Sequence, residues 1–290
     1  MGTILDGKRV AAELRARLEG RIAALTERNA RPALRIIRVG ENRDDLAYEK
    51  GILKACSLLG VDVYVSALPE DASSGAPLEA LRRANADESI HGIMVFRPLP
   101  ERFAGEAVHA AIDPGKDVDC MSPLNLERLF EGRPGGFAPC TPEAVIEMLK
   151  AYEIPLRGAN VAVVGRSMVV GRPLAMLLLR EDATVTLCHS RTRNLSAVTR
   201  RADIVVAAVG RARFMTPEFF GPDAVVIDVG INDDGSGKLC GDVDFERCEP
   251  RVGAISPAVG GVGAITSTVL LAHVVLACEG IAKINGCNLT

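Results

Sequence analysis

Several residue types are scarce in this 290-residue chain, which has no tryptophan, three tyrosines and four histidines. Its cysteines are scattered and none forms a C-x-x-C pair, so neither a zinc site nor a disulfide framework is indicated. We therefore expect no bound metal, and we interpret the thiols as small buried hydrophobic groups. The eight cysteines are Cys56, Cys120, Cys140, Cys188, Cys240, Cys248, Cys278 and Cys287.

A large excess of charge is also lacking, because 34 basic and 37 acidic residues leave a net charge of −3. Proteins that bind nucleic acid or an anionic membrane surface usually carry a basic excess, so we expect neither partner. No apolar run reaches membrane-spanning length with the right flanks, and the first residues, MGTILDGKRV, do not resemble a signal peptide. The sequence thus predicts a cytoplasmic protein.

Hydrophobic residues make up 48% of the chain, and its length suits two domains. Short apolar runs alternate with segments of helical periodicity, which predicts an α/β fold with parallel sheets. The polar, turn-rich segment 113–142 is interpreted as the crossover into the second domain. In the first half, the expected strands are 33–39, 61–67 and 92–96, and the expected helices are 6–28, 44–60, 77–85 and 103–112.

The second half is organised around residues 159–195, which read as a strand, a glycine turn, a helix and another strand. This unit is the first half of a Rossmann-like dinucleotide-binding fold. We expect an N-terminal α/β domain at 1–140, a dinucleotide domain at 141–265, and a C-terminal helix, about 266–290, that packs back on the first domain. The expected strands of the second domain are 160–164, 183–188, 204–209, 224–229 and 254–255, and the expected helices are 142–151 and 174–179.

The turn after the first of these strands reads GRSMVVG, from Gly165 to Gly171. Glycine lets the backbone approach a pyrophosphate, and the free N–H groups at a helix N-terminus attract anions. The spacing is not G-x-G-x-x-G, however, and the same glycines could serve only to pack the strand against the helix. The turn alone leaves both interpretations open.

The end of the next strand indicates which dinucleotide is bound. An acidic residue there normally binds the ribose 2′-hydroxyl of NAD, but this chain has His189, Ser190 and Arg191. A hydroxyl and the guanidinium groups of Arg166 and Arg191 suit a 2′-phosphate. We favour NADP, with NAD as the alternative cofactor and a solvated loop as the explanation that involves no ligand.

At this point the motifs carry a resemblance that covers nearly the whole chain. They are KDVD at 116–119, PCTP at 139–142, VGRS at 164–167, VGRP at 170–173, CHSRT at 188–192, DVGIN at 228–232, GDV at 241–243 and GGVG at 260–263. In this order they resemble the bifunctional methylenetetrahydrofolate dehydrogenase/methenyltetrahydrofolate cyclohydrolase (FolD) family. The resemblance implies two α/β domains with a folate cleft between them and a homodimer formed through the dinucleotide domains.

The resemblance also implies an activity and a set of site residues. The family oxidises 5,10-methylenetetrahydrofolate with NADP and then hydrolyses the methenyl product. Its pterin-binding aspartate matches Asp119, and its tyrosine that stacks on the aminobenzoate ring matches Tyr48; we assign both as catalytic. The candidate substrate-binding residues are Tyr48, Phe96, Pro98, Leu99, Asp119 and Gly261. The candidate cofactor-binding residues are Thr141, Gly165, Arg166, Ser167, Gly171, His189, Ser190, Arg191, Gly210, Gly230, Ile231 and Thr266.

The chain departs from the family pattern at two linked positions. The family has a lysine four residues after the tyrosine, where this chain has Ile52, and a glutamine where it has Phe96. That lysine acts in the hydrolysis step, and isoleucine can neither activate water nor move protons. Lys50 and Lys54 point away from the helix face that carries Ile52. Arg97 is a new charge here, interpreted either as a solvated rim residue or as a contact for an anionic substrate.

Four hypotheses follow, in order of preference. The first is a dehydrogenase with little cyclohydrolase activity. The second is a fully bifunctional enzyme in which Arg97, Lys54 or another group replaces the lysine. The third is a catalytically impaired paralogue that binds folate or nucleotide. The fourth is an oxidoreductase for a different substrate, in a site made more apolar by Ile52 and Phe96.

Overall fold

The computed structural model describes residues 2–103 and 105–284, and the chain forms two compact units. The six-stranded unit contains residues 1–13 and 141–266, and the three-stranded unit contains residues 14–140 and 267 onward. Both are built from parallel strands connected by helices, as the alternating sequence pattern predicts.

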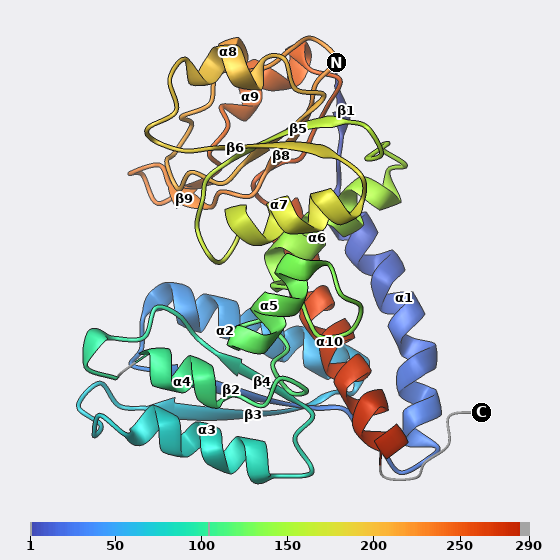
Figure 1. Cartoon of the computed structure of the whole chain (residues 1–290), viewed down its shortest axis with the longest axis vertical. Helices are drawn as coiled ribbons and strands as arrows, with labels where there is room; N and C mark the ends of the chain where they lie inside the picture. Colours follow the sequence, from blue (N-terminus) through green and yellow to red (C-terminus); the bar gives the residue numbers. More distant parts are fainter. Residues whose placement is uncertain (1, 104, 285–290) are drawn as a thin grey trace. The chain divides into compact units, whose positions relative to one another are not determined.

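The six-stranded unit has the strand order β1-β11-β8-β7-β5-β6, and every pair in it is parallel. Strands β5 and β7 each lie between two other strands and are apolar along nearly their whole length, because helices cover both faces. In Figure 1, α8 and α9 lie on one side of the sheet and α6 and α7 on the other. The strands are β1 Thr3–Ile4, β5 Asn160–Val164, β6 Thr184–Cys188, β7 Ile204–Ala207, β8 Val225–Asp228 and β11 Ala254–Ile255. The helices are α6 Cys140–Ala151, α7 Gly171–Arg180, α8 Leu195–Thr199 and α9 Phe245–Cys248.

The first residues of the chain belong to this unit, although the sequence analysis assigned them to the N-terminal domain. Strand β1 pairs with β11, with Thr3 opposite Ala254, and so adds an edge to the sheet. The phenol oxygen of Tyr152 accepts a hydrogen bond from the backbone N–H of Asp6 at 2.6 Å. A two-residue strand has too short a pattern to be recognised from sequence, and only its partner fixes it.

The three-stranded unit has the order β3-β2-β4, also parallel. Its buried cluster includes Ile37 on β2 and Ile93 on β4, and in Figure 1 helices α3 and α4 lie side by side on one face of this sheet. The strands are β2 Ala33–Val39, β3 Asp62–Leu68 and β4 Gly92–Val95. The helices are α1 Gly7–Thr26, α2 Arg43–Leu59, α3 Ala76–Ala86, α4 Gly105–Ala111, α5 Pro123–Glu131 and α10 Val262–Ile284, of which α1 and α10 begin in the other unit.

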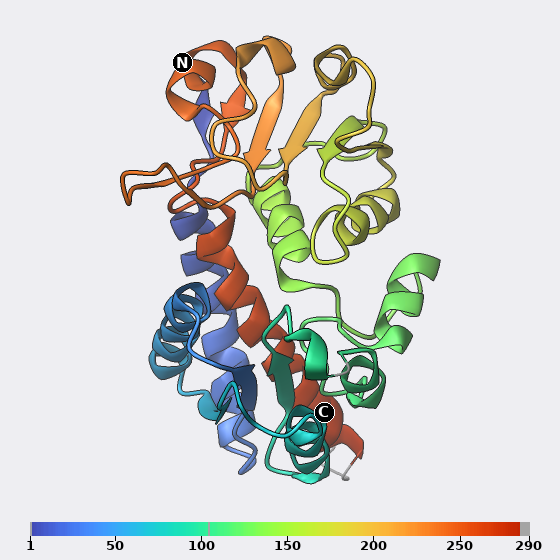
Figure 2. The same cartoon turned by 90° about the vertical axis from the view of Figure 1, so that its left-hand side faces the viewer.

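The second part of α10 lies beside α1 in this unit, as both views show (Figures 1 and 2). Arg21 on α1 donates two hydrogen bonds to the Glu279 carboxylate, each 2.8 Å long. This bidentate ion pair fixes the register of the two helices. The sequence analysis extends the helix to residue 290, and positions 285–290 lie outside the described residues.

Helix α10 is also long and apolar enough to cross a membrane over Val262–Ile281, whereas we expected no run of that length. In the protein, 61% of its most apolar window is buried. Core helices satisfy the same length and composition test, so the apolar character of α10 already has an explanation within the fold.

Helix α5 is the main element that the sequence analysis missed, because it lies in the segment interpreted as a crossover. Ser122 caps it by accepting a hydrogen bond from the backbone N–H of Asn125, Pro123 occupies the first turn, and Gly132 ends it with φ +67°. These are ordinary start and stop signals. The sequence contains these signals, but the polar composition of the segment led to its interpretation as a crossover.

Candidate functional sites

The carboxyl ends of five parallel strands meet at one edge of the six-stranded sheet. The turns that follow them contain Gly165, His189, Gly210, Gly230 and Gly261. The structure thus gathers at one edge most of the residues assigned to the cofactor, from Gly165 to Ile231, which are up to 66 positions apart in the sequence. This edge is where open α/β sheets bind ligands.

The turn after β5 is closely packed. Gly165 has φ +135°, and a Cβ added there would collide with the carbonyl oxygen of Ala208. A Cβ on Gly171 would collide with the carbonyl oxygen of Gly165, so both glycines are required by backbone contacts within the protein. Arg166 and Ser167 are exposed between them. The turn therefore presents these two polar side chains beside the N-terminus of α7, the position at which a dinucleotide-binding turn holds a pyrophosphate.

The turn after β6 is closed by its own side chains. The backbone N–H of His189 donates to Thr192 Oγ1 at 2.9 Å, and the N–H of Arg191 donates to His189 Nδ1 at 3.1 Å. Ser190 and Arg191 are left exposed, and residues 189–194 contain no carboxylate. A hydroxyl and a guanidinium presented in this way fit a phosphate on the ribose better than a free ribose hydroxyl.

Asp242, which the sequence analysis left without a role, holds the turn after β7. Its fully buried carboxylate accepts hydrogen bonds from three successive backbone N–H groups, those of Val209, Gly210 and Arg211, at 2.6, 3.1 and 2.8 Å. Asn232 Nδ2 donates a fourth at 3.0 Å. The carboxylate occupies the concave face of the turn and fixes the position of Gly210.

Asp228, at the end of β8, holds the next turn. It accepts hydrogen bonds from the backbone N–H groups of Gly230, Asp242 and Val243 at 3.0, 3.1 and 2.9 Å. Burial, helped by the charge of the neighbouring Asp242, raises the pKa of Asp228 to about 7 against the lowering effect of these three donors. The two aspartates thus stabilise consecutive turns of the candidate cofactor edge. In the sequence, the only sign of this role was that both acidic residues stand beside apolar strands.

Four other assigned residues of this unit differ in their surroundings. Ile231 follows Gly230 and is 55% exposed. An apolar side chain exposed at this edge is suitably placed for contact with a ligand. Thr141 lies in the first turn of α6. Thr266 lies in the first turn of α10 and is buried, and its hydroxyl donates to the carbonyl oxygen of Val262 at 3.2 Å. Gly261 packs tightly, because a Cβ there would collide with the carbonyl oxygen of Pro257.

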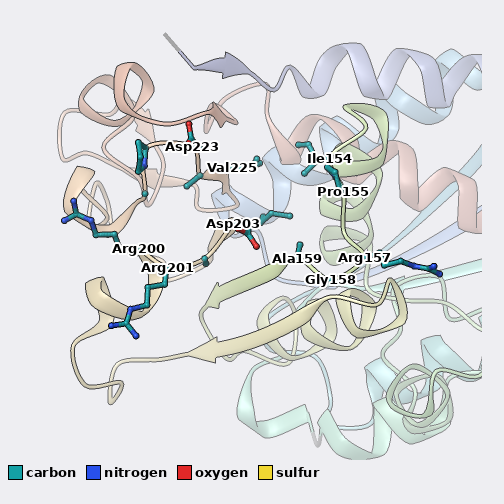
Figure 3. Close-up of a pocket in the computed structure, with 15 residues that line it drawn as sticks. Ile154, Pro155, Arg157, Gly158, Ala159, Arg200, Arg201, Asp203, Asp223 and Val225 are labelled. Atoms are coloured by element: carbon teal, nitrogen blue, oxygen red, sulfur yellow. The ribbon is translucent and has the colours of Figure 1, made fainter.

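A hollow of about 530 Å³ opens at the opposite edge of this sheet, by the amino ends of β5, β7 and β8 (Figure 3). Three arginines line it, but Figure 3 shows that the guanidinium groups of Arg157, Arg200 and Arg201 point away from one another. Asp203 already accepts two hydrogen bonds from Asn160. The hollow has no converging polar groups and lies away from the carboxyl ends of the strands, so we do not assign it as a ligand site.

In the three-stranded unit, the candidate substrate residues Tyr48 and Phe96 lie together. Their ring centroids are 5.7 Å apart, with the rings tilted by 33°. Burial raises the pKa of the Tyr48 phenol well above its usual value, and the nearby Cys140 and Asp119 add to the effect. Ile52, one turn after Tyr48 on α2, is 0% exposed. Ile52 and Phe96 therefore form a buried apolar wall beside Tyr48, with a phenol and a carboxylate next to it.

Asp119 is held from both sides. Arg97 Nη2 donates to Asp119 Oδ2 at 2.9 Å, and the backbone N–H of Cys140 donates to Oδ1 at 3.0 Å. Arg97 is therefore not the solvated rim residue of the first interpretation drawn from the sequence, because it is only 19% exposed and is paired with Asp119. The pair joins residues 22 positions apart, and only the placement of the 116–119 loop beside β4 brings them together.

The other residues of the KDVD motif build the loop that carries Asp119. The Lys116 ammonium donates to the carbonyl oxygens of Asn85 and Asp87 at 2.9 and 2.8 Å, at the C-terminal end of α3. The buried Asp117 carboxylate accepts from the backbone N–H groups of Met121 and Ser122, each at 2.8 Å. Lys116 and Asp117 are thus structural and Val118 is fully buried, which leaves Asp119 as the outward-facing side chain of the motif.

Helix α2 is fixed next to Tyr48 by an ion pair. Arg38 Nε on β2 donates to Glu49 Oε2 at 2.8 Å, and both side chains are almost entirely buried. Lys50 and Lys54 are exposed on α2, as the helical spacing predicts. Of the remaining substrate candidates, Pro98 is exposed, whereas Leu99 packs partly against the buried cluster around Ile93.

Comparisons with known proteins agree with this arrangement. The tetrahydrofolate dehydrogenase/cyclohydrolase catalytic domain matches residues 5–119, and the NAD(P)-binding domain of the same family matches residues 139–282. The bifunctional protein FolD of Alkaliphilus oremlandii is 50% identical over 279 residues, covering 96% of this chain and 98% of the relative.

Solved structures give the same result. The Campylobacter jejuni FolD methylenetetrahydrofolate dehydrogenase/cyclohydrolase has a TM-score of 0.94 and 38% identity, covering 97% of this chain and 99% of the other. The Trypanosoma brucei FolD, complexed with NADP and an inhibitor, has a TM-score of 0.91 and 34% identity, covering 96% and 98%. The chain therefore belongs to the tetrahydrofolate dehydrogenase/cyclohydrolase family.

Proposed function

We propose that this protein is an NADP-dependent 5,10-methylenetetrahydrofolate dehydrogenase whose cyclohydrolase step is weak or lost. The observation that carries the second part is the apolar wall beside Tyr48. Ile52 is 0% exposed and Phe96 is 6% exposed, and they stand where the family has a lysine and a glutamine. The NADP-dependent dehydrogenase is the activity that the family membership supports.

The dehydrogenase step makes modest demands on the protein. Oxidation of the methylene carbon to a methenyl group removes a hydride, which NADP accepts when it is bound. No proton is transferred at the reacting carbon, so the residues of this chain need only bind and orient the folate. The Asp119 carboxylate accepts hydrogen bonds from the N–H groups of the pterin, and the Tyr48 ring offers a flat apolar surface to the aminobenzoate group.

The hydrolysis step also needs an acid–base group, because water must be activated and protons must move to the folate nitrogen. A positioned acid–base group typically contributes about 10²- to 10⁴-fold to such a step. Neither Ile52 nor Phe96 has a titratable or hydrogen-bonding group. The exposed Lys54 lies on another face of α2, and Arg97 is engaged by Asp119, so neither residue replaces the lysine.

The cofactor site fits NADP on two observations in the six-stranded unit. The GRSMVVG turn lies at the N-terminus of α7 and leaves Arg166 and Ser167 exposed. The turn after β6 presents Ser190 and Arg191 and has no carboxylate to bind a free ribose hydroxyl. A single charge-assisted hydrogen bond to a 2′-phosphate favours NADP over NAD by about 10-fold or more.

A two-step assay tests the proposal. With 5,10-methylenetetrahydrofolate and NADP, we expect reduced cofactor to form while the methenyl compound accumulates, and we expect a lower rate with NAD. With the methenyl compound alone, its decay should stay close to the buffer blank. Hydrolysis well above the blank would show that another group replaces the lysine, and the protein would then be fully bifunctional. If no reduced cofactor forms, the dehydrogenase assignment fails, and an impaired paralogue or another substrate becomes the better explanation.

We also propose that the protein is a homodimer. Strand β6 is an edge of the six-stranded sheet, and its Leu187 is 37% exposed. An unpaired edge strand with apolar side chains favours pairing with a second copy. Light scattering should give a mass of twice 30.7 kDa, and Leu187→Lys should lower it towards that of the monomer. A wild-type mass of 30.7 kDa would contradict the proposal.

A further inference from the structure

The Arg97–Asp119 pair lies in a shielded part of the three-stranded unit. The two side chains are 19% and 18% exposed, unlike most ion pairs of this protein, in which at least one partner is more open to solvent. Arg97 comes directly after the buried Phe96 at the end of β4, and Asp119 ends the KDVD loop. Both residues are thus anchored by elements that other contacts already fix.

The hydrogen-bonding capacity of the pair is only partly used. A guanidinium has five N–H groups, and in residues 2–103 and 105–284 the only acceptor recorded for Arg97 is Asp119 Oδ2, reached by Nη2. Asp119 Oδ1 accepts one hydrogen bond from Cys140 N, and a carboxylate oxygen can accept a second. The pair therefore presents free donors beside free acceptors, next to the Tyr48 phenol.

We propose that Arg97 is a second substrate-binding residue of the folate site, which donates a hydrogen bond to the 4-oxo oxygen of the pterin while Asp119 accepts from N3–H and the 2-amino group. A 4-oxo pterin presents along one edge an acceptor followed by two donors. The guanidinium and carboxylate, side by side, are complementary to that order. This inference rests on the proposed function, because it concerns the same substrate and the same site.

Two simpler roles would give the same ion pair. Arg97 could only hold Asp119 in position, or it could cover Asp119 and compete with the ligand. The three roles differ in how binding depends on the group at C4 of the pterin. A 4-thioxo pterin keeps N3–H and the 2-amino group for Asp119 but replaces the oxygen acceptor at C4 by a weakly accepting sulfur, so only direct contact makes Arg97 distinguish the two.

The experiment measures binding of tetrahydrofolate and of its 4-thioxo counterpart, in which sulfur replaces the 4-oxo oxygen, by calorimetry with NADP present. The variants are Arg97→Met, which removes the donors, and Arg97→Lys, which keeps the charge without the planar fork. Arg102→Met is the matched control, because Arg102 is an exposed arginine five positions away. Unchanged NADP affinity shows that each variant is folded.

We expect Arg97→Met to weaken tetrahydrofolate binding by about 10- to 100-fold, the value of a hydrogen bond to a charged group, and to lower the preference for the 4-oxo compound by about tenfold. Arg97→Lys should fall between wild type and Arg97→Met, and Arg102→Met should match wild type. Steady-state kinetics should agree: the KM for the folate should rise, whereas the KM for NADP should stay unchanged.

Three results would overturn the inference. If Arg97→Met binds tetrahydrofolate as tightly as wild type or more tightly, Arg97 competes with the ligand. If both compounds are weakened equally and the preference is unchanged, Arg97 only positions Asp119. In these two cases, turnover of 5,10-methylenetetrahydrofolate by the wild type still supports the proposed function. If the wild type binds no tetrahydrofolate at all, the proposed function and the inference fail together.

Discussion

The double variant Ile52→Lys with Phe96→Gln should hydrolyse methenyltetrahydrofolate at least about 100-fold faster than the wild type. The wild-type rate should lie near the buffer blank, because the wall beside Tyr48 contains no acid–base group. The gain follows from placing an amine on the same helix face as Tyr48, one turn later. The measurement is the loss of methenyl absorbance in the absence of NADP.

Both changes are needed for the full effect. Position 52 is 0% exposed, so a lysine there lies in a poorly solvated site, and burial lowers its pKa towards neutrality. A neutral amine can accept a proton from water, but it needs a hydrogen-bond partner to avoid being buried unpaired. The Phe96→Gln change supplies that partner. The rate should therefore rise with pH through the lowered pKa of the new amine.

The controls separate chemistry from damage to the site. Ile52→Met keeps the apolar wall and should show no hydrolysis, and each single variant should gain less than the double variant. Phe96→Gln removes the ring that lies 5.7 Å from Tyr48, so dehydrogenase activity should be measured in every variant. A double variant that binds folate and NADP, retains the dehydrogenase step and gains no hydrolysis would show that another feature limits this step.

The local parts of the fold were predictable because their signals lie within a few residues. Strand β5 has the predicted bounds of 160–164, and its run of β-branched residues is typical of a strand buried on both faces. Strand β1 and the hairpin of β9, Asn232–Asp233, and β10, Leu239–Cys240, could not be predicted in this way. Each is two residues long and exists only because another strand pairs with it.

The candidate sites also combine residues that local sequence signals identify with residues whose roles depend on distant partners. Asp119 and Tyr48 could be assigned because a family motif carries each of them, and Gly165 because a glycine follows a strand. The partner of Asp119 could not be assigned, since Arg97 reaches it only after β4 and the KDVD loop come together. Asp228 and Asp242 were visible as acidic residues in apolar surroundings. Their bracing role depends on backbone N–H groups whose directions only the fold determines.

Asp119→Asn should lower kcat/KM for 5,10-methylenetetrahydrofolate by about 100- to 1000-fold and leave the affinity for NADP unchanged. The amide has one acceptor oxygen and no charge, so it cannot replace a carboxylate that binds two N–H groups, each such charge-assisted bond being worth about 1.5–3 kcal/mol. The change also leaves the Arg97 guanidinium, which is 19% exposed, without its counter-ion. Steady-state kinetics with each substrate varied in turn would measure the effect.

Asp113→Asn is the matched control, because Asp113 is an exposed carboxylate six positions earlier in the same segment, and it should leave kcat/KM within about twofold of wild type. The double variant Arg97→Met with Asp119→Asn separates the two contributions to the loss. If the unpaired guanidinium causes part of it, the double variant should be less impaired than the sum of the single effects. Strict additivity would mean that the pair is not coupled in the bound state. An Asp119→Asn enzyme with wild-type kcat/KM would show that the carboxylate does not bind the folate.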